Sequence, residues 1–126
     1  THGEFFRSLP DASQGEQLQT LCEAGGFRIE RIVSNGQASP PGFWYDQNWD
    51  EWVLILRGEA TMRLQDPDEI LHLAAGDWIS LPAHRRHRVE STSQDPATVW
   101  LAVHGHALAP PKEVYSKKSP RLRASA

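Results

Sequence analysis

Two apolar segments in the middle of the chain each join a strand-like run to a glycine, and they limit the possible fold more than any other feature. The first segment, Glu-Trp-Val-Leu-Ile-Leu-Arg-Gly, runs from Glu51 to Gly58, and the second runs from Gly76 to His87. A short apolar run bounded by a turn residue is typical of a β-strand. Each segment also places a possible metal ligand, Glu51 or His87, at the start of a strand. We therefore expect a carboxylate and an imidazole on neighbouring strands.

Similar short runs recur along most of the chain and indicate an all-β fold. Turn residues such as Asn35-Gly36 and Asp66-Pro67 separate them. Strands that recur about every 8 to 12 residues are typical of a β-sandwich or barrel. His104 closes the last run and is expected at the surface. The pattern predicts strands over residues 27–33, 51–57, 60–64, 70–73, 78–81, 87–91 and 98–104.

The chain of 126 residues suits a single domain with an extension at each end. Near the N-terminus, Ser13 and Glu16 have the spacing of a helix-capping box. We expect a short helix there that ends at Gly25-Gly26. The C-terminal end is rich in lysine and arginine and predicts a basic tail. The three parts are an arm over residues 1–26, a barrel over residues 27–104 and the tail over residues 105–126.

Composition excludes several classes of partner. The net charge of −3 argues against bulk binding of nucleic acid. No apolar run approaches the length of a membrane span, and the N-terminal residues lack the order of a secretory leader. Cys22 is the single cysteine, which fits a reducing compartment. We expect a cytoplasmic protein that takes a small molecule, with no organic cofactor indicated because a phosphate-binding glycine loop is missing.

The two central segments together resemble the motifs of the cupin family. The first cupin motif ends in Glu, six residues and Gly, which Glu51 and Gly58 match. The second motif contains Gly, Pro and His at the spacing of Gly76, Pro82 and His87. The barrel part of the chain is similar to small bacterial single-domain cupins. This resemblance implies a double-stranded β-helix of jelly-roll type, a fold that hosts many different activities.

The first motif departs from the family pattern where cupins carry two metal-binding histidines. With a three-residue gap before the Glu, those positions hold Tyr45 and Gln47. With a four-residue gap, they hold Trp44 and Asp46. In the second motif, His84 replaces a glycine. Two of the four usual ligands are therefore replaced.

A divalent metal site is one interpretation of these residues. Glu51 and His87 offer a carboxylate and an imidazole if strand alternation points both into the barrel. Gln47 and Asp46 would add oxygen ligands. One nitrogen with two or three oxygens suits zinc, iron, manganese or nickel. The simpler alternative is a buried Glu51–His87 ion pair or hydrogen bond without metal.

Further residues complete the predicted site. His84 and Tyr45 are candidate acid–base groups. Three arginines, Arg85, Arg86 and Arg88, cluster around His87. They are either exposed charges at the edge of a strand or a rim that attracts an anionic ligand. The predicted pocket is lined by Trp44, Tyr45, Val53, Ile55 and Val89.

Three functions stay open at this point. The first is a metal-dependent enzyme of oxygenase, isomerase or lyase type. The second is a small-molecule-binding or sensor module without catalysis. The third is a metal-independent isomerase in which His87 or His84 is the base and Tyr45 the acid. From the resemblance to cupins we also expect a homodimer, with Phe5-Phe6 and Leu9-Pro10 in the contact.

Overall fold

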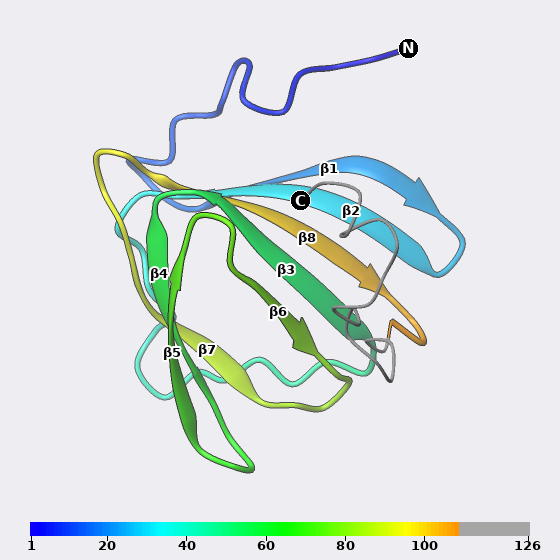
Figure 1. Ribbon diagram of the computed structural model, residues 1–126, viewed down its shortest axis with the longest axis vertical. Helices are drawn as coiled ribbons and strands as arrows, with labels where there is room; N and C mark the ends of the chain where they lie inside the picture. Colours follow the sequence, from blue (N-terminus) through cyan, green and yellow to red (C-terminus); the bar gives the residue numbers. More distant parts are fainter. Residues whose placement is uncertain (109–126) are drawn as a thin grey trace, which may run out of the picture.

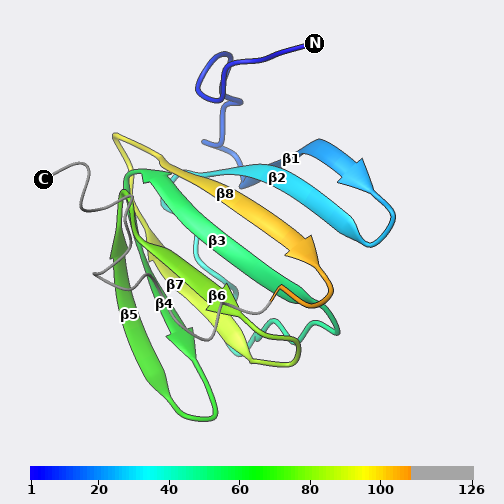
Figure 2. The same cartoon turned by 45° about the vertical axis from the view of Figure 1, so that its right-hand side comes forward.

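The computed structural model describes residues 1–108, which form two antiparallel β-sheets that face each other (Figure 1). The larger sheet has the strand order β1-β2-β8-β3-β6, and the smaller sheet has the order β5-β4-β7. A second view shows the smaller sheet covering one face of the larger (Figure 2). The strands are β1 (Gln17–Ala24), β2 (Phe27–Ser34), β3 (Asp50–Arg57), β4 (Glu59–Leu64), β5 (Glu69–Ala74), β6 (Trp78–Leu81), β7 (His87–Thr92) and β8 (Thr98–Gly105).

This arrangement agrees with the sandwich or barrel that the strand pattern predicts, and it is the jelly roll that the resemblance to cupins implies. Each of the seven predicted strands matches an observed strand to within one residue at either end. Strand β3 lies between β8 and β6, and β8 lies between β2 and β3. Both strands are therefore hydrogen-bonded on two sides, and most side chains on both of their faces are buried or half-buried.

The predicted N-terminal helix is wrong, because its residues form strand β1 instead. Strand β1 pairs antiparallel with β2, and Ala24 lies opposite Phe27. Gly25-Gly26 is consequently a two-residue hairpin turn, with a φ of +75° at Gly26, and not a helix stop. A helix of one or two turns is marginal in water, whereas the edge of β2 offers hydrogen bonds along the whole segment. Pairing with β2 therefore outweighs the local capping signal.

Two other expectations concern the ends of the chain and membranes. The predicted basic tail lies outside the described residues from residue 109 onward. Within residues 1–108, the structure contains no helix that is long and apolar enough to cross a membrane.

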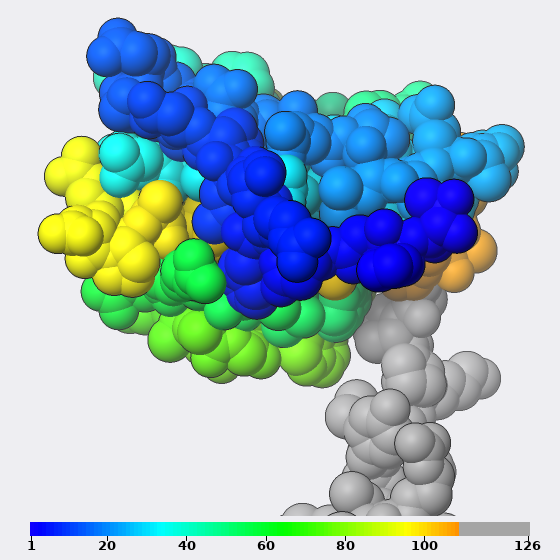
Figure 3. Space-filling model, turned by 90° about the horizontal axis from the view of Figure 1, so that it is seen from above, coloured from blue at the N-terminus to red at the C-terminus, as the bar shows by residue number. Residues whose placement is uncertain are grey.

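The N-terminal segment lies across one face of the barrel (Figure 3, dark blue). The Arg57 guanidinium lies 4.3 Å from the centre of the Phe6 ring, which is a cation–π contact. Arg31 donates a hydrogen bond of 2.6 Å to the carbonyl oxygen of Phe5. These contacts hold Phe5-Phe6 against its own barrel. The homodimer, in which these rings would contact a second copy, stays a prediction.

Alternation along β3 points Glu51, Val53 and Ile55 into the barrel, as predicted. The exposed fractions of these residues are 8%, 4% and 0%. Glu51 is thus a buried carboxylate at one end of an apolar interior, where the core gives way to polar groups. The core consists of Val53, Ile55, Ala60, Met62, Leu64, Leu73, Ile79, Leu81, Trp100 and Ala102.

Gly58 makes the tight corner between β3 and β4, and we predict that Gly58→Ala destabilises the fold strongly. Its φ is +80°, and an added Cβ would lie 2.8 Å from the carbonyl oxygen of Ala97. Positive φ and this clash together should cost about 3 kcal/mol of unfolding free energy, measured by urea denaturation. Gly42→Ala is the matched control, because Gly42 has a φ of +77° in open space and should lose only about 1 kcal/mol. Equal losses in the two variants would contradict the role given to crowding.

Candidate functional site

A cavity of about 160 Å³ lies between the two sheets at the polar end of the core. A larger groove of about 530 Å³ runs outside the β1–β2 turn and shares only Arg28 and His104 with the cavity. The cavity holds most of the buried titratable groups, so we place the candidate site there. Its apolar floor consists of Val53, Met62, Leu81, Val89 and Trp100.

Glu51 and His87 meet in this cavity from opposite sheets. Strand β3 of the larger sheet carries Glu51, and β7 of the smaller sheet begins with His87. The distance from His87 Nε2 to Glu51 Oε1 is 3.8 Å, and both side chains are buried. Reciprocal backbone hydrogen bonds with Tyr45 fix the start of β7, at 2.8 Å and 3.2 Å. The two motifs of the sequence thus converge on one pair of titratable groups.

The hydrogen bonds of His87 determine which of its ring nitrogens is free. Nδ1 lies 2.9 Å from the carbonyl oxygen of Arg85. A carbonyl oxygen only accepts, so Nδ1 carries the proton and donates. In the neutral ring, Nε2 then directs its lone pair toward Glu51. The Tyr45 ring stacks on the imidazole with ring centres 5.2 Å apart, which fixes the plane of the ring.

His104 is buried beside Glu51, so the expectation that it lies at the surface is wrong. The indole Nε1 of Trp49 lies 2.9 Å from His104 Nδ1. An indole N–H only donates, so Nδ1 accepts and the proton of the neutral ring is on Nε2. That Nε2 donates to Glu30 Oε1 at 2.7 Å. Burial lowers the pKa of His104, in keeping with a neutral ring whose nitrogens are both engaged.

Glu30 and His104 are the functional residues that the sequence patterns missed. His104 follows Trp100 and Ala102 at alternate positions of β8, and both of these are buried. Glu30 precedes Ile32 in the same way on β2. Alternation counted from Trp100 was therefore a signal for His104. Nothing in the sequence indicates that Glu30 lies next to it.

Burial changes where the proton of the Glu51–His87 pair resides. Desolvation, helped by the negative charge of Glu30, raises the pKa of Glu51 to about 7, although a hydrogen bond from Gln47 opposes this. Desolvation also lowers the pKa of His87. In water, histidine would take the proton from a glutamic acid. In the cavity an ion pair is costly, so a protonated Glu51 beside a neutral His87 is favoured below about pH 7.

The predicted pocket residues divide into two groups. Ile55 lies in the core and is not part of the cavity lining. Trp44 also lies outside the lining, with the Arg88 guanidinium 5.9 Å from its ring centre. The predicted residues that do line the cavity beside Glu51 and His87 are Tyr45, Gln47, Val53 and Val89.

Asp46 and His84 form a separate pair outside the cavity. Asp46 Oδ1 lies 2.8 Å from His84 Nδ1, and the two side chains are 46% and 68% exposed. The backbone N–H of His84 donates to the carbonyl oxygen of Gln47. This pair joins two loops at the surface. The structure therefore does not bring Asp46 to the Glu51–His87 pair as a ligand, or His84 as an acid–base group.

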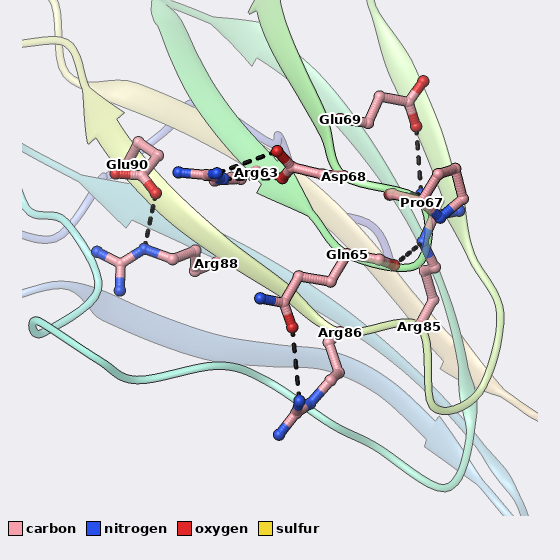
Figure 4. Close-up of polar contacts among 9 residues, drawn as sticks. All are labelled: Arg63, Gln65, Pro67, Asp68, Glu69, Arg85, Arg86, Arg88 and Glu90. Atoms are coloured by element: carbon pink, nitrogen blue, oxygen red, sulfur yellow. Dashed lines mark hydrogen bonds and ion pairs between the residues drawn. The ribbon is translucent and has the colours of Figure 1, made fainter.

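The three clustered arginines make polar contacts outside the cavity lining, and Figure 4 shows several of them. Arg85 donates to two carbonyl oxygens of the β4–β5 turn, at 2.7 Å and 3.0 Å. Arg88 donates to carbonyl oxygens of the segment 39–43 and pairs with Glu90 at 2.8 Å. Arg86 is half-exposed and lies 3.9 Å from Asp46. Arg85 and Arg88 thus hold loops in place, and none of the three arginines lines the site.

Comparison with known proteins settles the family. A model of the cupin domain matches residues 31–104. The chain belongs to the cupin family. This cupin is 48% identical to a “putative mannose-6-phosphate isomerase” from Ralstonia eutropha JMP134, with a TM-score of 0.80, over 85% of this chain and 99% of that chain. None of the curated proteins matches the chain.

More distant structures share the cupin fold. A cupin superfamily protein from Desulfitobacterium hafniense DCB-2 is 18% identical, with a TM-score of 0.65, over 78% of this chain and 84% of its own. A protein from Thermus thermophilus is 17% identical, with a TM-score of 0.67, over 83% of this chain and 96% of its own. These likenesses concern the fold alone, because the identities are low.

The site meets part of what a metal ion requires. His87 fits, because its Nε2 is free while Nδ1–H is held by a carbonyl oxygen, and Glu51 supplies a carboxylate. Tyr45 and Gln47 stand where cupins carry histidines, and both nitrogens of His104 are engaged. In the described part of the chain, no three His, Cys, Asp or Glu side chains converge as a metal site. The ligand set is therefore incomplete, and we derive no chemical step from a metal.

We predict that Glu51→Gln stabilises the protein at pH 8 but not at pH 4.5. The folded pKa of Glu51 is raised from 4.5 to about 7, so its favourable contribution is complete below pH 4.5 and is lost as the pH rises through 7. Glutamine imitates the protonated acid at every pH. The variant should therefore gain on the order of 2 kcal/mol over the wild type at pH 8, from urea unfolding. Glu59→Gln, at an exposed position, is the control, and a pH-independent difference for Glu51→Gln would refute the prediction.

Proposed function

We propose that this cupin binds a small molecule in the cavity and catalyses proton transfer on it, as an isomerase does. The observation that carries the proposal is the free Nε2 of His87, which lies 3.8 Å from the buried Glu51 in a cavity with an apolar floor. A neutral base beside a protonated acid is the arrangement that general acid–base catalysis uses near neutral pH. The 48% identity to the Ralstonia protein supports an isomerase, since that protein is named as one.

In the proposed reaction, His87 Nε2 takes a proton from a carbon next to a carbonyl group of the ligand. The electron pair of that C–H bond forms a double bond to the carbonyl carbon, the π pair of the C=O bond moves onto the oxygen, and Glu51 donates its proton to that oxygen. In the second half, the pair of the carbon–carbon double bond takes the proton back from His87 at the former carbonyl carbon. Glu51 takes the proton of the hydroxyl on the first carbon, whose oxygen becomes the new carbonyl. Tyr45 also lines the cavity, and desolvation raises the pKa of its phenol, which therefore stays a hydrogen-bond donor. The apolar floor limits the access of water to the intermediate.

His87→Gln should lower the rate of this proton transfer by roughly 100-fold or more, because glutamine has no basic nitrogen. The measurement is deuterium uptake from D₂O at the carbon next to the carbonyl, followed by NMR, over a panel of aldoses, ketoses and their phosphates. The exposed His72→Gln is the matched control. His84→Gln separates the two candidate bases, since its ring lies outside the cavity. Specific binding without any uptake would instead support a non-catalytic binding module.

The metal-dependent alternative is favoured by the orientation of His87, and metal content separates the two proposals. We expect less than one equivalent of zinc, iron, manganese or nickel by elemental analysis of protein grown with these metals, because the ligand set is incomplete. Deuterium uptake should also persist with a chelator present. One equivalent of metal that is lost in His87→Ala would point to the metal-dependent enzyme. The homodimer and the cytoplasmic location stay predictions.

A further inference from the structure

The cavity carries a surplus of negative charge. Glu16, Glu30 and Glu51 line it, and Arg28 is the single lysine or arginine among the described lining residues. Arg28 Nε lies 3.4 Å from Glu30 Oε2, so these two charges offset each other. His104 is neutral because its Nδ1 accepts a hydrogen bond, and burial lowers the pKa of His87 and so favours its neutral form. Above about pH 7, where Glu51 is charged, three carboxylates therefore face one guanidinium group, and the described lining has a net negative charge.

Among the residues that the structure describes, the free polar atoms of the cavity include strong hydrogen-bond acceptors, beside one buried donor without a hydrogen-bond partner, Arg28 Nε. His87 Nε2 presents a lone pair, and the Glu51 carboxylate accepts in its charged form. Glu16 adds an exposed carboxylate at the edge of the lining. His104 brings an N–H group, but this already donates to Glu30. A ligand that donates hydrogen bonds satisfies these acceptors, whereas a phosphate or carboxylate would bring further negative charge beside Glu16, Glu30 and Glu51.

Apart from Arg28, the arginines near the site lie outside the cavity lining. Arg85 and Arg88 spend their guanidinium N–H groups on backbone carbonyl oxygens, as Figure 4 shows for Arg85 in the β4–β5 turn. Arg86 lies beside Asp46 at the surface. None of these arginines belongs to the cavity lining. Within the described lining, an anionic group would meet three carboxylates and one guanidinium group, that of Arg28, which lies beside Glu30.

We propose that the cavity selects a polyol-like ligand without negative charge, and that it prefers one that carries an ammonium group. The inference rests on the proposed function, because it concerns the substrate of the same cavity. Hydroxyl groups donate to Glu51 and to His87 Nε2. An ammonium group donates up to three hydrogen bonds and offsets the carboxylate surplus. The apolar C–H face of a sugar-like ligand suits the floor around Val53 and Trp100.

Three sugars that differ only at carbon 6 test this selection. The sugars are mannose, 6-amino-6-deoxymannose and mannose 6-phosphate, each titrated into the full chain by calorimetry at pH 8, where Glu51 is charged. We expect the amino sugar to bind at least about tenfold more tightly than the phosphate, with mannose between them. Glu51→Gln should shrink that ratio by reducing affinity for the amino sugar most. Glu59→Gln, on the outside of β4, should leave all three affinities unchanged.

Each other outcome has a definite meaning. If mannose 6-phosphate binds more tightly than mannose, the proposed preference against negative charge is overturned. Loss of that tight binding in Arg28→Gln would show that the Arg28 guanidinium binds the phosphate. Deuterium uptake on the phosphate would then still uphold the proposed proton transfer. Failure of all three sugars to bind also overturns the selection, and the exchange panel decides the proposed function separately. If Glu51→Gln does not fold, the comparison of the three sugars on the wild-type chain still decides.

Discussion

Strand β8 holds the site together, because it pairs with β2 on one side and with β3 on the other. In these ladders Glu51 lies opposite His104, and Glu30 lies opposite Ala102. The inward faces of three adjacent strands thereby place two carboxylates around one imidazole, at 2.7 Å and 4.0 Å from His104 Nε2. A slip of one residue in either ladder would turn its side chains to the opposite face. The electrostatics of the cavity therefore depend on the register of β8.

Burying this many titratable groups opposes folding unless each has a partner. His104 is satisfied by Trp49 on one ring nitrogen and by Glu30 on the other. The charged form of Glu51 is poorly stabilised, since it is buried next to the like charge of Glu30 and the neutral imidazole of His87. Its pKa is therefore raised. The core below it is apolar and closely packed. A poorly compensated group on a well-formed barrel is typical of a functional site, where local stability is given up for reactivity.

The cupin scaffold is kept here, whereas two positions of its first motif differ. Glu51 and His87 occupy the positions that the two motifs define, but Tyr45 and Gln47 stand in place of the first two histidines. Tyr45 stacks on His87, and Gln47 stabilises the charged form of Glu51, so both replacements interact with the remaining pair. His104 arrives from a different strand and is held in one tautomer. The positions of the two histidines in the cupin motif are thus occupied by a stacking ring and an amide.

Much of the barrel could be predicted, because turn residues and apolar runs are local signals that strand formation depends on directly. The segment that forms β1 could not, since its capping residues favour a helix and only the free edge of β2 makes a strand better. The inward direction of Glu51 followed from alternation along one strand. The approach of His87 to it depends on which sheets face each other.

By itself, the sequence determined the cupin framework, the strand positions and the identity of the central acid–base pair. Only the tertiary structure decided that Glu30 and His104 line the cavity beside this pair and that Asp46 and His84 lie outside it. It also decided that Arg85 and Arg88 bind the carbonyl oxygens of loops. The reason is that side-chain direction along a strand is a local property. Which side chains contact each other across strands depends on the register and packing of segments that are far apart in the chain. The protonation states that follow from burial depend on the same packing.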